Sequence, residues 1–186
     1  MNANRTHTAQ EALELLKEGN LRYLAAETGT GDISPAIREK TCSEGQTPYA
    51  IIITCSDSRV IPESIFSAGI GDLFVIRVAG NVIDDHQLGS IEYAASHLGS
   101  RLVVVLGHDH CGAVGAAIAG GAHGFIQTIT DEIKRAIGTE TDDTKACCLN
   151  VQNSVRLIRE KLPLDGVQVV GALYRLADGS VEFLEG

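Results

Sequence analysis

Short apolar runs separated by polar, glycine-containing segments recur along the chain, and their length is that of buried β-strands. Five runs of this kind occupy residues 51–54, 73–78, 102–106, 167–176 and 180–184. The first and third runs carry no charged residue, as expected for strands covered on both faces of a parallel sheet. The last two flank the turn dipeptide Asp178-Gly179, which predicts an antiparallel hairpin.

Helical periodicity and capping signals occur between these runs. The expected helices are one after the capping box of Thr8 and Glu11, one starting at Ser34-Pro35, one over residues 86–98, one from Gly112 and one over residues 151–162. The first carries an apolar stripe over residues 12–24 that must be covered. Strands alternating with helices predict an α/β fold, with a mostly parallel central β-sheet flanked by helices and an antiparallel C-terminal edge strand.

Length and pattern together favour a single domain. A chain of 186 residues with 44% hydrophobic content can bury a substantial core, and it contains no repeats. The polar segment at residues 138–145 is interpreted as a loop, because the helical pattern resumes directly after it. We expect one domain over residues 1–186, with an N-terminal helical arm over 1–30 and an α/β core over 46–186.

Composition narrows the class of partner. A net charge of −9 and the absence of a Lys/Arg cluster argue against nucleic acid or an anionic membrane surface, and favour small-molecule chemistry. Residues 1–10 lack the apolar core of a signal peptide and no apolar run is long enough to span a membrane, so we expect a cytoplasmic protein. Five cysteines in such a chain are expected to be metal ligands and free thiols.

Cysteine and histidine side chains follow two of the predicted strands. Cys55 comes directly after the first strand, and His108 and Cys111 come directly after the third. The carboxyl ends of parallel strands lie at one edge of a sheet, so two thiolates and one imidazole would meet there. This donor set suits zinc with one open position, whereas magnesium or calcium would require oxygen ligands. Taken alone, His108-x-x-Cys111 fits a capped strand-to-helix turn equally well.

Asp57 and Arg59 lie two and four residues after the first cysteine. Zinc with two thiolates and a neutral imidazole is formally uncharged and should acidify its water less than a three-histidine site does. A carboxylate just outside the metal shell could orient that water, provided that an arginine keeps the carboxylate ionised and off the metal. The alternative is a surface ion pair without functional weight.

The pattern Cys55-x-Asp57-x-Arg59 followed by His108-x-x-Cys111 resembles the β-class carbonic anhydrases. The resemblance runs from about residue 46 to residue 114. It implies a zinc lyase that interconverts carbon dioxide and bicarbonate, with one zinc ion per subunit and hydroxide held by zinc as the nucleophile. One departure is visible, because Val78 follows the strand arginine Arg77 where the family usually has asparagine.

The resemblance extends to the plant-like subclass through the residues of its substrate pocket. That subclass places a glutamine nine residues before the first zinc cysteine, a phenylalanine nineteen residues after it and a tyrosine fifteen before the zinc histidine. Here these positions are Gln46, Phe74 and Tyr93. The resemblance also implies that the backbone N–H of Gly112 binds substrate. Without the family spacing, the aromatic residues would be interpreted as core and Gln46 as a solvated loop residue.

Family members are dimers or higher assemblies with the pocket at the subunit interface, and their N-terminal helix typically lies across the partner. The resemblance therefore implies a homodimer or a larger homo-oligomer, with the stripe at residues 12–24 docked on a second subunit.

Two other functions remain open. A hydrolase of carbonyl sulfide or carbon disulfide would need the same groups. A non-catalytic protein could close the zinc site with Cys42, Cys147 or Cys148, although the pair of Asp57 and Arg59 argues against a closed site. Among the remaining histidines, His110 is a candidate proton relay.

Overall fold

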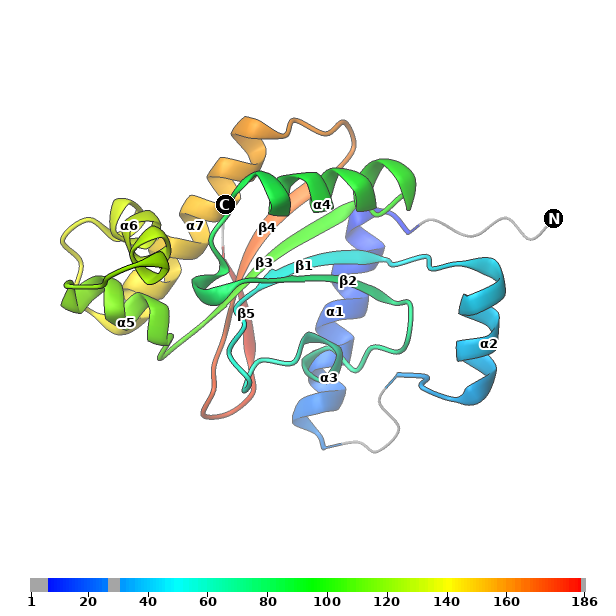
Figure 1. Ribbon diagram of the computed structural model, residues 1–186. Helices are drawn as coiled ribbons and strands as arrows, with labels where there is room; N and C mark the ends of the chain where they lie inside the picture. The colour runs from blue at the N-terminus through cyan, green and yellow to red at the C-terminus, as the bar shows by residue number, and fades with distance from the viewer. Residues whose placement is uncertain (1–6, 27–30, 185–186) are drawn as a thin grey trace.

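A five-stranded sheet forms the centre of the computed structural model, which describes residues 7–26 and 31–184 (Figure 1). Its strands lie in the order β2-β1-β3-β4-β5. Their bounds are β1 Ala50–Thr54, β2 Leu73–Arg77, β3 Leu102–His108, β4 Gln168–Tyr174 and β5 Val181–Leu184. The first four are parallel and β5 is antiparallel to β4. The predicted α/β class and the antiparallel C-terminal edge strand are confirmed.

The strand order reverses beside β1. The chain passes from β1 to β2 on one side and then crosses to β3 on the other, so both neighbours pair with β1 in parallel. In that register Thr54 lies opposite Arg77 of β2 and Leu106 of β3. Ligands of open α/β sheets bind at the carboxyl ends of the strands where the order reverses. The fold therefore places this position at the ends of β1 and β3.

Helices cover both faces of the sheet (Figure 1). Helices α1 (Ala9–Leu24) and α3 (Pro62–Ile65) lie on one face, where Ile52 and Val104 point. Helices α4 (Asp85–His97) and α7 (Asp143–Lys161) cover the other face, with Ile51 and Val105. Alternate residues of β1 and β3 thus belong to two separate cores, which explains why the whole of each run is apolar.

The apolar stripe of α1 was expected to dock on a second subunit, but it packs in the core of its own chain. The capping box of Thr8 and Glu11 is present, but Leu16 is fully buried in the core of its own chain. A Cβ on Gly19 would lie 1.9 Å from the carbonyl oxygen of Phe66, so α1 packs directly on the segment that ends α3. The stripe covers the chain's own sheet because that face would otherwise be exposed. The parts of the predicted arm at residues 1–6 and 27–30 lie outside the described residues.

The remaining helices lie at the two ends of the sheet. They are α2 (Pro35–Glu44), capped by Ser34 as predicted, the 3-10 turn η1 (Ala79–Asn81), α5 (Gly112–Ala119) and α6 (Phe125–Ile137). Helices α3, which is a single turn, and α6 were not predicted from the sequence pattern. It was also wrong to place all of residues 138–145 in a loop, because α7 begins at Asp143 with Asp142 as its N-cap.

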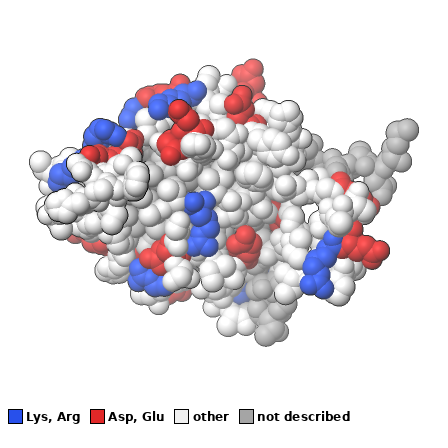
Figure 2. Space-filling model, viewed as in Figure 1, with Lys and Arg blue, Asp and Glu red and all other residues white. Residues whose placement is uncertain are grey.

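On the face drawn in Figure 2, lysine and arginine side chains are scattered among acidic ones and form no continuous basic patch on the described residues. Within the same part of the chain, no helix has the length and apolar character needed to cross a membrane.

A substitution at Gly107 would test how closely α7 packs against β3. A Cβ at this position would lie 2.4 Å from Cγ2 of Val151, a stiff and fully buried side chain of α7. We expect Gly107→Ala to lower the free energy of unfolding by roughly 1–3 kcal/mol, because overpacking displaces α7. Urea denaturation would measure the change.

The matched control is Gly115→Ala in α5, where a Cβ would meet nothing within 4 Å. Alanine in a helix is favoured over glycine by about 0.5–1 kcal/mol, so this variant should be neutral or more stable. Equal stabilities of the two variants would contradict the packing argument.

Candidate metal centre

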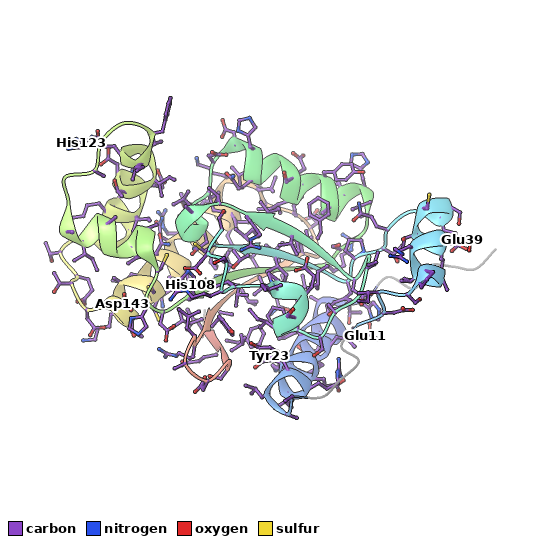
Figure 3. The ribbon with its side chains drawn as sticks, turned by 60° about the horizontal axis from the view of Figure 1, so that its bottom comes forward. Glu11, Tyr23, Glu39, His108, His123 and Asp143 are labelled. Atoms are coloured by element: carbon purple, nitrogen blue, oxygen red, sulfur yellow. The ribbon has the colours of Figure 1, made fainter. Side chains whose placement is uncertain are left out.

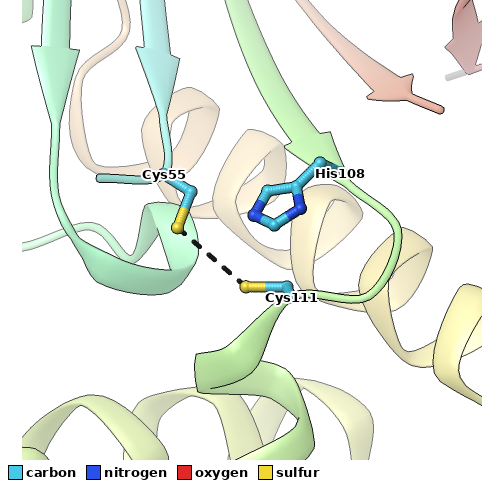
Figure 4. Close-up of side chains that lie close together, drawn as sticks. All are labelled: Cys55, His108 and Cys111. Carbon is cyan, nitrogen blue, oxygen red and sulfur yellow. Dashed lines mark hydrogen bonds between the residues drawn. The ribbon is translucent and has the colours of Figure 1, made fainter. Parts of the chain in front are cut away.

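Three side chains converge where the strand order reverses. Cys55 directly follows β1, His108 is the last residue of β3, and Cys111 is the N-cap of α5. One donor atom from each lies within 4.8 Å of the others, and the two Sγ atoms are 4.0 Å apart (Figure 4). All three residues are buried. The parallel register of β1 and β3 therefore assembles the predicted donor set.

The imidazole of His108 has one nitrogen free to bind a metal. Nδ1 lies 2.7 Å from the backbone oxygen of Asp109, and because a carbonyl can only accept, Nδ1 carries the proton. Nε2 is buried and has no hydrogen-bond partner among the described residues. A buried polar atom without a partner is costly, and a metal ion at this point would satisfy it. In metal sites, the ring nitrogen of a histidine that does not bind the metal typically donates to a backbone carbonyl, which orients the ring.

The two thiols are too close for both to ionise without a cation. The hydrogen bond that the two thiols share lowers the pKa of Cys55 to about 4, against the effect of burial. The same interaction raises the pKa of Cys111. Two thiolates side by side are stable only when a positive charge lies between them, and two thiolates with an imidazole are a donor set that suits zinc. The three residues therefore fit this metal.

Asp57 and Arg59 lie beside the donors. Nε and Nη2 of Arg59 donate to Oδ1 and Oδ2 of Asp57 at 2.9 and 2.7 Å, which is a bidentate pair. The hydrogen bonds from Arg59 hold the pKa of the Asp57 carboxyl well below its usual range. Oδ2 of Asp57 is 3.9 Å from Nε2 of His108. An ionised carboxylate thus stands next to the donor group, fixed in place by an arginine.

Two residues of the centre had no role assigned from the sequence. Arg77 donates to the backbone oxygens of Cys55 at 3.2 Å and Asp57 at 2.8 Å, and so holds the segment that carries both. The backbone N–H of Gly80 donates to Sγ of Cys55 at 3.3 Å. Arg77 could have been found as the charged residue that ends an otherwise apolar strand. Val78, the departure from the family pattern, packs its side chain against the same cluster as Cys55.

The other predicted substrate residues fall into two groups. Gly112 is the first residue of α5 and adjoins Cys111. Phe74 and Tyr93 lie together, with ring centroids 6.2 Å apart, but Phe74 pairs with Ile51 at the opposite end of β1 from Cys55. At about 3.3 Å per residue, this separation is roughly 13 Å. Gln46 is exposed and precedes β1. Within one chain, the structure does not bring Gln46, Phe74 or Tyr93 to the donors.

His110 and the remaining cysteines stay outside the donor group. The His110 side chain is 73% exposed. The backbone N–H of His110 donates to Asp143, the first residue of α7, which is labelled together with His108 in Figure 3. Burial raises the pKa of the Cys147 thiol to about 12. Among the described residues, neither Cys147 nor Cys148 joins Cys55, His108 and Cys111 in a metal-capable group.

Comparison with known proteins gives consistent matches. A family model described as carbonic anhydrase matches residues 50–181. The carbonic anhydrase of Mycolicibacterium smegmatis is 36% identical over 92% of this chain and 91% of that protein. Carbonic anhydrase 2 of Mycobacterium tuberculosis is 52% identical over 58% of this chain and 52% of that protein. A structure of tetrameric β-carbonic anhydrases from Sordaria macrospora aligns with a TM-score of 0.72 and 28% identity, over 82% of this chain and 88% of the other.

Proposed function

The chain belongs to the β-class carbonic anhydrases, and we propose that it catalyses the reversible hydration of carbon dioxide to bicarbonate and a proton at the centre formed by Cys55, His108 and Cys111. This activity makes the protein a lyase. The observation that carries the proposal is the convergence of two thiols and one unpartnered imidazole nitrogen within 4.8 Å, at the end of the sheet where ligands bind.

Cys55, His108 and Cys111 are proposed as the ligands of one zinc ion per subunit. Zinc bound by three protein side chains supplies a Lewis acid that lowers the pKa of water and makes hydroxide available near neutral pH. The Nδ1 hydrogen bond to the Asp109 carbonyl orients the His108 ring and leaves Nε2 as its donor atom. The fold also keeps Cys111 at the N-terminus of α5, where the helix dipole favours an anion.

Asp57 is proposed to orient the attacking water. Its carboxylate is ionised and can accept a hydrogen bond from the nucleophile, which turns a lone pair toward the substrate carbon. Both of its oxygens are engaged by Arg59, so the carboxylate is held in one position beside the donors. Gly112 is exposed at the start of α5, where backbone N–H groups have no helical acceptor, and this suits an oxygen of bicarbonate.

The rival functions have less support. The relatives described above are named as carbonic anhydrases, which favours carbon dioxide over carbonyl sulfide or carbon disulfide as the substrate. A closed structural site would need a fourth protein ligand, and the metal-capable group of the described residues contains none of Cys42, Cys147 and Cys148. The pair of Asp57 and Arg59 also has no water to orient in a closed site.

The ligand assignment predicts a contrast between two sets of cysteines. Cys55→Ala and Cys111→Ala should each lose most bound zinc and reduce carbon dioxide hydration to background, because two remaining ligands hold zinc weakly. Cys147→Ser and Cys148→Ser should keep one zinc per chain and near-normal rates. Metal analysis and stopped-flow hydration assays measure both properties. Loss of zinc from Cys147→Ser would favour the closed structural site, and full zinc in Cys55→Ala would refute the assignment.

Arg59→Ala tests the orienting role of Asp57. We expect the variant to retain zinc but to lose roughly 10–100-fold in kcat, because the carboxylate is no longer held in place. The control is Arg156→Ala, which removes an exposed arginine that pairs with Glu160 on α7 and should leave kcat unchanged. A normal kcat in Arg59→Ala would contradict the role.

We also propose that a homodimer or larger homo-oligomer completes the pocket. Phe74 and Tyr93 lie far from the donors of their own chain, and Tyr93 is 48% exposed. Phe74 lies in β2 and Tyr93 lies beside it on α4. Strand β2 ends the sheet and keeps its apolar side chains only half-buried. A second copy could bring Gln46, Phe74 and Tyr93 to the neighbouring centre, with Gln46 donating a hydrogen bond to substrate and Phe74 forming the apolar wall. The Sordaria relatives are described as tetrameric.

Mixing two inactive variants tests this shared pocket. Cys111→Ala removes the metal side of the site and Gln46→Ala removes the exposed substrate side. In a 1:1 mixture about half of the dimers are mixed, and each mixed dimer has one intact site of two, so activity should return to roughly a quarter of normal. Cys111→Ala mixed with Arg59→Ala is the control, because both changes affect the metal side and no complete site can form. Failure of the first mixture to recover, after subunit exchange is verified by mass spectrometry, would place the pocket within one chain.

Domain extent and cellular site complete the proposal. We propose one domain over residues 1–186 with a catalytic core over 46–186, and helix α1 of the predicted 1–30 arm packs onto the sheet of this core. The described cysteines are free, which suits a reducing compartment such as the cytoplasm. The net charge of −9 supports a small-molecule substrate without a nucleic-acid or membrane partner.

A further inference from the structure

Helix α7 carries two buried polar side chains on the face that packs against the metal centre. Asn150 and Ser154 are one turn apart and only 2% and 1% exposed. Their neighbours on this helix, Val151 and Val155, belong to the apolar core. Buried polar groups are costly unless they are hydrogen-bonded, so the partners of these two residues indicate what they do.

Both side chains bind the backbone of η1. Nδ2 of Asn150 donates to the carbonyl oxygen of Gly80 at 2.7 Å, and Oγ of Ser154 donates to that of Asn81 at 3.1 Å. Gly80 and Asn81 both have positive φ values, 69° and 45°. Glycine adopts this region freely, but Asn81 does so at a cost, so its surroundings must hold it there. Helix α7 supplies that restraint, with one hydrogen bond to each residue.

Gly80 links this restraint to the metal centre. Its carbonyl accepts from Asn150, while its N–H, on the other side of the same Cα, donates to Sγ of Cys55 at 3.3 Å. A Cβ on Gly80 would lie 2.7 Å from Cδ1 of Ile133 and 3.0 Å from Cβ of Ala113, so the residue is confined from a second side. The Asn150 contact fixes the peptide group that follows Gly80, and through the φ and ψ angles of Gly80 it restrains the preceding peptide group, which carries the N–H.

We propose that Asn150 is a positioning residue that holds the Gly80 N–H on the Cys55 thiolate and thereby sets how strongly that sulfur donates to the metal. The proposal rests on the metal centre of the proposed function. An N–H···S bond withdraws electron density from a thiolate, which leaves the metal a stronger Lewis acid. Ser154 binds the carbonyl of Asn81, which is one residue further from the sulfur contact than that of Gly80. Ser154 therefore anchors η1 without this electronic effect.

Cobalt-substituted protein separates the two roles. In Asn150→Leu, which keeps the side-chain volume but removes the donor, we expect the thiolate-to-cobalt charge-transfer band to move to longer wavelength, because the sulfur becomes more electron-rich. In the zinc form kcat should fall by roughly tenfold with KM for carbon dioxide unchanged. Ser154→Ala, an equally buried change on α7 that removes the other hydrogen bond to η1, should leave the band at its normal wavelength.

Asn150→Ala serves as a smaller replacement in case the leucine variant does not fold. A normal band position in a folded Asn150 variant would overturn the proposal, and so would equal shifts in the Asn150 and Ser154 variants, which would indicate loop anchoring alone. Absence of any thiolate band in the unaltered cobalt protein would instead overturn the metal centre itself, so the two failures are distinguishable.

Discussion

The parallel register of β1 against β3 is the constraint on which the rest of the structure depends. Thr54 lies opposite Leu106, and its Oγ1 donates to the Leu106 carbonyl at 2.8 Å. This hydrogen bond holds the two strands in register near their carboxyl ends. Cys55 then leaves β1 beside the point where β3 ends in His108. A slip of one residue would turn each side chain to the other face of the sheet and separate the donors.

The convergence of these donors creates an electrostatic problem that the chain solves only in part. Two thiols 4.0 Å apart cannot both ionise, and Nε2 of His108 lacks a partner among the described residues. A divalent cation would remove both costs at once, so metal binding and folding stability are coupled at this end of the sheet. The bidentate pair of Asp57 and Arg59 complements the arrangement, because it keeps a carboxylate close to the donors yet already bonded on both oxygens.

Features set by local sequence could be predicted, and features set by distant contacts could not. The strands, the α1 capping box and the three donors follow from apolar runs, cap residues and strand ends. Helix α6 was missed even though Ile129, Ile133 and Ile137 recur on one face, because the glycine-rich stretch before it obscured its start. The role of Asn150 has no local signal, since its partner Gly80 is 70 residues away in the chain. The packing of α1 on the sheet of its own chain likewise could not be predicted, because an apolar stripe does not specify which chain covers it.

Helix α7 joins the packing of the sheet to the chemistry at its edge. Val151 lies where a side chain on either Gly107 or Gly171 would collide with it, so two neighbouring strands lack a Cβ where the helix approaches. That close approach is what allows Asn150, the preceding residue, to reach Gly80 and through it Cys55. The glycine that precedes His108 in β3 therefore has two consequences. It permits the helix to pack, and it places the hydrogen-bond donor that restrains the opposite ligand, so both sides of the donor set depend on the position of one helix.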